Sequence, residues 1–123
     1  MAHYVDGFVL PVLRKNLAAY ARMAKKASKI FVEHGALDYK ECAGDDLNVK
    51  IGLPFPKGIK TKPGETVVFS YIVYKSRKHR DQVNAKIMQD PRIAALCDTK
   101  NVPFDCARML YGGFKTIVEI KAH

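Results

Sequence analysis

The sequence predicts one α+β domain over residues 1–123, with the element order β-α-β-β-α-β. Three observations lead to this fold class. Residues 65–74 are β-branched or aromatic at eight positions, which is the strongest strand signal in the chain. Two helical patterns are each flanked by strand-like runs. No apolar run approaches the ~20 residues that a membrane span needs, so the chain is expected to be a globular domain without a membrane segment.

The first strand is expected over residues 4–12, where Pro11 should end the regular pairing or lie on an edge. A helix should follow, with Asn16 as its N-cap. Its small and aromatic residues recur at three- and four-residue steps, which indicates one buried face. Gly35 suits the left-handed position that ends such a helix.

The second strand is expected over residues 37–43, where alternation places Glu41 on the same side as Tyr39. The connection over residues 45–64 is longer than most loops, so it is either functional or covers another part of the fold. Three apolar residues in it favour packing against the domain: Leu53, Phe55 and Ile59.

A type II turn at Pro63-Gly64 should lead the chain into the third strand, residues 65–74. Ser76 is the expected N-cap of the second helix, and Asp90-Pro91 should end or kink it. Its apolar face is predicted to hold Val83, Ile87 and Met88. The last strand is expected over residues 109–120, with Gly112-Gly113 marking a bulge or a close backbone approach.

This order is the ferredoxin-like arrangement, a four-stranded antiparallel sheet with two helices on one face. The third strand is nevertheless apolar on both sides. An uncovered sheet face carrying Phe69 and Tyr71 would be a large exposed apolar patch, which soluble monomers avoid. The simplest cover is a second copy related by two-fold symmetry, so the sequence predicts a homodimer through the sheet face.

The composition of the chain indicates which kind of partner and which cellular compartment to expect. The net charge of +9 favours an anionic partner, but the positive residues are scattered, which is typical of a basic solvated surface. Three cysteines without C-x-x-C spacing argue against a disulfide framework and indicate a reducing, cytoplasmic location.

Several segments resemble the YbaA-like family, a bacterial domain of unknown function. They follow one another in matching order over nearly the whole chain: Tyr4-Val5-Asp6-Gly7-Phe8-Val9, Glu33-His34-Gly35-Ala36-Leu37, Pro63-Gly64-Glu65-Thr66-Val67-Val68-Phe69-Ser70, Val73-Tyr74-Lys75-Ser76-Arg77 and Met109-Leu110-Tyr111-Gly112-Gly113-Phe114. The resemblance implies a dimeric α+β barrel and no established activity. Relatives in the broader superfamily include cofactor-independent monooxygenases, haem-degrading enzymes and small-molecule-binding proteins, and no catalytic motif of theirs is matched here.

Asp6, Glu41 and His79 are the candidate catalytic residues. The two carboxylates lie within expected strands, and paired in a pocket they could serve as acid and base. The alternative is that each lies at a solvated or edge position beside a Lys or Arg. His79 lies in the first turn of the second helix, where the helix dipole should keep it neutral.

The candidate ligand-binding residues include Arg77, Arg80 and Asn84, because two arginines at a helix N-terminus suit a carboxylate or phosphate. A solvated helix start is the alternative. Tyrosines form the second group, as pocket-lining hydroxyls or else as core and dimer contacts: Tyr71 and Tyr111, with Tyr20, Tyr39 and Tyr74. No histidine spacing supports a metal site, and no cofactor is expected.

Three functions stay open. The leading interpretation is a protein that binds a small anionic or aromatic metabolite between sheet and helices, with or without turnover. The second is a monooxygenase-like or isomerase-like enzyme that needs no cofactor. The third is RNA binding, since RNA-recognition modules stack bases where Phe69 and Tyr71 lie. Nucleic acid is disfavoured, because the Lys/Arg-Gly-aromatic-Gly signature is absent and one sheet face cannot both dimerise and stack bases.

Overall fold

A computed structural model describes residues 2–97 and 102–122. Its main elements are strand β1 (Tyr4–Leu13), helix α1 (Leu17–Glu33), strand β2 (Asp38–Ala43), strand β3 (Glu65–Tyr74), helix α3 (Arg77–Gln89) and strand β4 (Leu110–Lys115). Four short segments complete the chain: η1 (Arg14–Asn16), α2 (Phe55–Gly58), α4 (Pro91–Leu96) and η2 (Cys106–Arg108). The predicted order β-α-β-β-α-β is therefore confirmed, with these short segments added.

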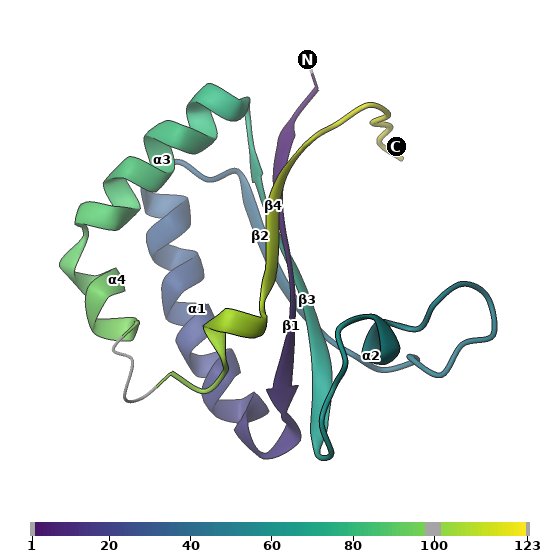
Figure 1. The fold of residues 1–123 in the computed structure, drawn as a ribbon. Helices are drawn as coiled ribbons and strands as arrows, with labels where there is room; N and C mark the ends of the chain where they lie inside the picture. Colours follow the sequence, from purple (N-terminus) through teal and green to yellow (C-terminus); the bar gives the residue numbers. More distant parts are fainter. Residues whose placement is uncertain (1, 98–101, 123) are drawn as a thin grey trace.

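The four strands form one antiparallel sheet in the order β2-β3-β1-β4. Helices α1, α3 and α4 lie together on one face, called here the inner face (Figure 1). The fold is thus α+β and ferredoxin-like, as predicted. The other sheet face, called here the outer face, is partly covered by the segment that contains α2 (Figure 1).

Strand β3 illustrates how the sheet directs its side chains to two opposite faces. Successive side chains point to opposite faces, so Val68, Ile72 and Tyr74 turn toward the helices and are 3% exposed or less. The turn that leads into β3 is as predicted, since Gly64 has a φ of 83° and the Glu65 amide donates to the Lys62 carbonyl.

The two long helices begin in different ways. Ser76 caps α3 as predicted, accepting a hydrogen bond from the His79 amide at 3.1 Å. Asn16 precedes α1, but its side chain makes no cap hydrogen bond, because the chain enters α1 through the η1 turn. Gly35 ends the α1 region with a φ of 118°, which fits the predicted positive-φ position.

The predicted apolar face of α3 is wrong at one residue. Val83 and Ile87 are buried, whereas Met88 is 83% exposed. One residue step turns a helix by about 100°, which carries Met88 away from the face that Val83 and Ile87 share. The chain breaks at Asp90 as expected, and the Asp90 carboxylate caps α4.

Strand β4 is shorter than predicted, ending at Lys115 instead of residue 120. Lys115 pairs with Tyr4, the first residue of β1, so beyond it there is no strand for β4 to pair with. The pairing register is continuous through both glycines, so there is no bulge. Gly113 instead permits a close approach, since a Cβ there would lie 2.9 Å from Arg80 Nη1.

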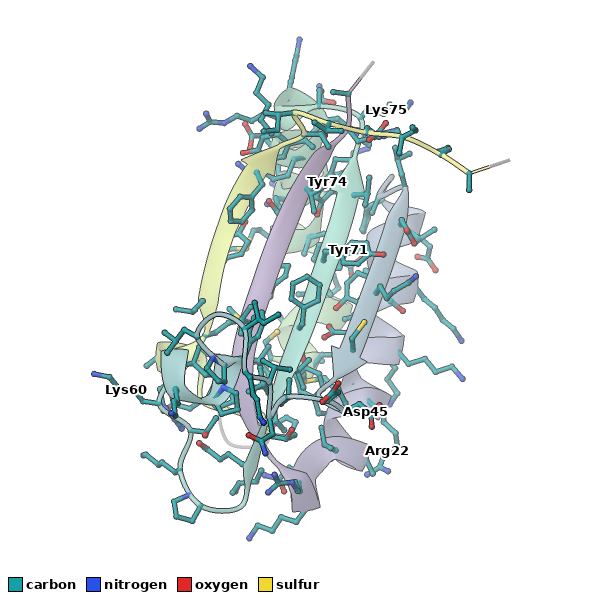
Figure 2. All side chains as sticks on the ribbon, turned by 90° about the vertical axis from the view of Figure 1, so that its right-hand side faces the viewer. Arg22, Asp45, Lys60, Tyr71, Tyr74 and Lys75 are labelled. Carbon is teal, nitrogen blue, oxygen red and sulfur yellow. The ribbon has the colours of Figure 1, made fainter. Side chains whose placement is uncertain are left out.

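The long connection before β3 packs on the sheet in part. Leu47 and Phe55 lie with Val67 and Phe69 around a pocket on the outer face. Figure 2 shows the molecule from this side, with Tyr71 of β3 labelled. Leu53, which the sequence predicts to pack down, is 73% exposed.

Large apolar side chains remain exposed on the rest of the outer face. Phe69, Leu110 and Phe114 are 44%, 57% and 61% exposed, respectively. None of the described helices combines the length and apolar character that a bilayer crossing requires.

Candidate functional site

A cavity of about 230 Å³ lies between the inner face of the sheet and the helices. Helix α1 forms one wall, strands β1, β2 and β3 form the opposite wall, and α3, α4 and the segment before β4 close it. Its surface is almost wholly apolar. Five aromatic rings contribute to it: Phe8, Tyr20, Phe31, Tyr39 and Phe104. We call this space the Glu41 cavity, after the one charged side chain among the described residues that line it.

Two tyrosines hold the Glu41 carboxylate. The Tyr20 hydroxyl donates to Oε1 at 2.8 Å, and the Tyr39 hydroxyl donates to Oε2 at 2.8 Å. Tyr39 and Glu41 are two residues apart on β2, so both point to the inner face. Tyr20 comes from the buried face of α1. The three side chains thus meet because strand alternation and helix amphipathicity direct them into the same layer.

These contacts fix the protonation state of the two phenols. Burial raises the pKa of Tyr20 and of Tyr39, and the negative charge of Glu41 raises both further. Both tyrosines are therefore protonated donors at neutral pH. They stabilise a carboxylate by hydrogen bonds and bring no positive charge to it.

A second polar cluster lies on the inner face near the start of α3. Arg80 Nη1 donates to Asp6 Oδ1 at 2.7 Å, and the Tyr111 hydroxyl donates to Asp6 Oδ2 at 3.2 Å. Arg80 also lies over the Tyr4 ring, 5.1 Å from its centroid. Asp6 is 1% exposed, so this is a buried ion pair and not the solvated position that the sequence left open.

Burial dominates the electrostatics of this cluster. It raises the pKa of Asp6, while the Arg80 charge and the Tyr111 and Arg80 hydrogen bonds act in the opposite direction. Burial and the nearby Asp6 charge also raise the pKa of Tyr74. The Tyr74 hydroxyl is fully buried and has no hydrogen-bond partner among the residues that the structure describes.

The two candidate carboxylates belong to separate sets. Asp6 is held by Arg80 and Tyr111, whereas Glu41 is held by Tyr20 and Tyr39. Asp6 is not among the residues that line the Glu41 cavity, and no described contact joins the two carboxylates. The geometry therefore gives no support to their predicted pairing as acid and base.

His79 and His34 make contacts that join elements of the fold. His79 Nδ1 accepts a hydrogen bond from the Lys75 amide at 2.9 Å, and its ring lies edge-on to Tyr74. Burial, aided by Lys75 and Lys86, lowers the pKa of His79, so the ring is held neutral. His34 Nε2 lies 2.8 Å from Asp90 Oδ2. Neither histidine is among the residues lining the Glu41 cavity.

The candidate anion-binding residues do not converge. The Arg80 guanidinium faces Asp6 and also donates from Nε to Asp81 at 2.8 Å. Arg77 is exposed and Asn84 is half-buried, and within the described residues neither side chain forms a hydrogen bond or an ion pair.

The two candidate tyrosines are on opposite faces of the sheet. Tyr71 is on the outer face beside Lys40, while Tyr111 is on the inner face, stacked on Phe8 with ring centroids 4.8 Å apart. They therefore cannot line one pocket.

Sequence reasoning missed how Glu41 is held. The available signal was the pair Tyr39 and Glu41 on one side of β2, together with Tyr20 on the buried side of α1. Met23, Phe104 and Met109 also line the cavity and were not identified. Within residues 2–97 and 102–122, no three His, Cys, Asp or Glu side chains gather as a set that could hold a metal ion.

Comparison with known proteins gives a sequence family. The model of the family described as "Protein of unknown function (DUF1428)" matches residues 3–106. The uncharacterized protein YbaA of Escherichia coli K12 is 42% identical over 116 residues, which cover 94% of this chain and 97% of that protein. YbaA of Shigella flexneri matches with the same identity and coverage.

Solved structures show the same fold at low identity. A NIPSNAP family protein with unknown function from Agrobacterium tumefaciens is 14% identical with a TM-score of 0.59, over 93% of this chain and 87% of that one. A dimeric ferredoxin-like protein from an uncultured marine organism is 11% identical with a TM-score of 0.57, over 98% of this chain and 100% of that one.

Proposed function

Since the chain belongs to the DUF1428 family of proteins of unknown function, its own geometry has to indicate what it does, and we propose that it binds a small, largely apolar aromatic molecule in the Glu41 cavity. The observation that carries this proposal is an apolar cavity between sheet and helices that contains one oriented carboxylate. A mostly apolar lining with a few fixed polar groups is the usual form of a small-molecule site.

The size of the cavity limits the ligand. An apolar cavity of about 150 Å³ is large enough to bind benzene. The Glu41 cavity measures about 230 Å³, so it accommodates one aromatic ring with a short substituent. An anionic ligand is disfavoured there because the described lining offers the negative charge of Glu41 and no cationic side chain.

A cavity-filling variant tests the proposal. Ala27 lines the cavity, whereas Ala21 lies on the exposed side of the same helix. Ligand-observed NMR with a set of one-ring aromatic fragments should detect binding to the wild type and to Ala21→Leu. Ala27→Leu should bind the same fragments at least about tenfold more weakly, because its side chain occupies the space. Unchanged binding by a folded Ala27→Leu variant would contradict the proposal.

We further propose that the chain acts as a single-domain homodimer in the cytoplasm, joined through the outer face. Phe69, Leu110 and Phe114 support this assembly, because a second sheet would cover their exposed side chains. A solved structure with the same fold is described as dimeric. The cytoplasmic location is supported by three free thiols, Cys42, Cys97 and Cys106. Light scattering should give twice the chain mass of 13.8 kDa, and a monomer at micromolar concentration would contradict the dimer.

A further inference from the structure

We propose that the ligand of the Glu41 cavity carries a protonated amine, which lies against the Glu41 carboxylate while an aromatic part fills the apolar space. This inference rests on the proposed binding function and names the chemical class of the ligand.

The two strand carboxylates that face the helices differ in how their charge is balanced. Asp6 is neutralised within the chain, because Arg80 Nη1 lies 2.7 Å from it. Glu41 has two phenol donors instead, and no Lys, Arg or His of the described chain forms an ion pair with it. Two hydrogen bonds stabilise the carboxylate without cancelling its charge. A cationic ligand group would give Glu41 the neutralising positive charge that Arg80 gives to Asp6.

The carboxylate also has room for a further donor. Tyr20 uses one oxygen of Glu41 and Tyr39 uses the other, and each carboxylate oxygen can accept two hydrogen bonds. An ammonium group has three N–H donors and no acceptor, so it matches an acceptor-only side chain. Ser70 pairs with Glu41 across the β2–β3 ladder and also lines the cavity, so its hydroxyl is a second acceptor for the same group.

The aromatic lining favours the same charge. A cation over the face of a Phe or Tyr ring is attracted by the ring quadrupole, most strongly where water is excluded. Five such rings surround the cavity. A carboxylic acid or phosphate would instead be repelled by the negative charge of Glu41. A neutral alcohol could still hydrogen-bond to Glu41, but it would gain neither the ion pair nor the cation–π attraction.

A matched ligand series tests this inference on the wild-type protein. Isothermal titration calorimetry would compare 2-phenylethylamine, 2-phenylethanol and phenylacetate, which share one ring and differ in the charge of the substituent. The amine should bind at least about tenfold more tightly than the alcohol, as expected for a charge-assisted hydrogen bond, and the acid should not bind measurably.

Two variants, each lacking one carboxylate, show whether the preference for the amine depends on Glu41. Glu41→Gln should lose the preference for the amine and keep binding of the alcohol. Asp38→Asn removes a carboxylate from the outer face of the same strand and should leave the preference unchanged. Equal binding of amine and alcohol by the wild type would overturn the amine inference and leave the proposed function standing. If none of the three molecules binds, the proposed function fails as well.

Discussion

Arg80 Nη1 lies 2.7 Å from Asp6 Oδ1, and this ion pair joins the first turn of α3 to a central strand of the sheet. The two side chains are 13% and 2% exposed, so water stabilises neither charge effectively. The Tyr111 hydroxyl reaches the second oxygen of Asp6 and brings β4 into the same contact. The buried Asp6 carboxylate therefore helps to hold α3 in its position over the sheet.

Removing Arg80 should strongly destabilise the fold. Arg80→Met leaves Asp6 buried without its cation, and the free energy of unfolding should fall by about 3 kcal/mol. Urea denaturation followed by circular dichroism measures this change. Arg77→Met removes an exposed arginine from the same turn and should change stability by less than about 0.5 kcal/mol.

A double variant separates the ion pair from general packing. Combining Asp6→Asn with Arg80→Met removes both charges, so the loss should be smaller than the sum of the two single losses. Strictly additive losses would show that the two residues do not act as a pair.

The bond between Glu65 and Arg108 predicts a loss of stability in acid. Arg108 donates to both Glu65 oxygens at 2.7 and 2.9 Å, which lowers the pKa of Glu65 to about 2 in the folded protein. The ordinary value in the unfolded chain is 4.5. Because the folded pKa is the lower one, the contribution of Glu65 is complete above pH 4.5 and is lost as the pH falls toward 2.

Thermal melts of the wild type and Glu65→Gln should show this window. The wild type should be more stable at pH 7 by about 1 kcal/mol, a few degrees in Tm, and the difference should shrink between pH 4.5 and 2. Asp90 also has a lowered pKa, so the comparison uses the difference between the two proteins. A difference that stays constant over this range would rule out a Glu65 contribution.

If the protein dimerises through the outer face, a charge placed on that face should separate the protomers. Phe114→Asp places a charge among the exposed apolar side chains of that face, so the mass measured by light scattering should fall from dimer to monomer. Met88→Asp introduces the same charge on α3, at a residue that is 83% exposed, and should remain dimeric. If both variants stay dimeric, the sheet face is not the interface.

Cys97 offers a chemical reporter of cavity occupancy. Cys97 is exposed as a whole residue but also lines the Glu41 cavity, and partial burial raises the pKa of its thiol, so its alkylation by iodoacetamide should be slowed. A bound ligand should slow it further by several-fold, whereas Cys42, outside the cavity lining, should react at an unchanged rate. Mass spectrometry of the digested protein measures both rates. Equal rates at Cys97 with and without ligand would place the ligand elsewhere.

Local patterns were enough to predict most of the fold. The β-branched and aromatic residues of β3, the turn at Gly64 and the cap at Ser76 are each local signals, set by residues near one another in sequence. The end of β4 was mispredicted because it depends on a distant residue, since pairing stops where β1 begins at Tyr4. Met88 was misplaced because a one-residue step changes the face of a helix.

Less of the candidate site could be predicted from the sequence. Asp6 and Arg80 are 74 positions apart, and only the assembled layers show that they form a pair. Glu41 and Tyr39 could be placed on one side of β2, but the contribution of Tyr20 and the size of the cavity depend on how closely α1 packs on the sheet. The sequence pattern of a strand shows to which face a side chain points, but its contacts depend on how the helices pack on the sheet.

A crystal structure of the protein grown with 2-phenylethylamine would show whether an aromatic amine binds beside Glu41. We expect electron density for the aromatic ring inside the Glu41 cavity, with the amine nitrogen within about 3 Å of a Glu41 oxygen. Density for the amine only on the outer face or at Asp6, with the Glu41 cavity empty, would contradict this expectation.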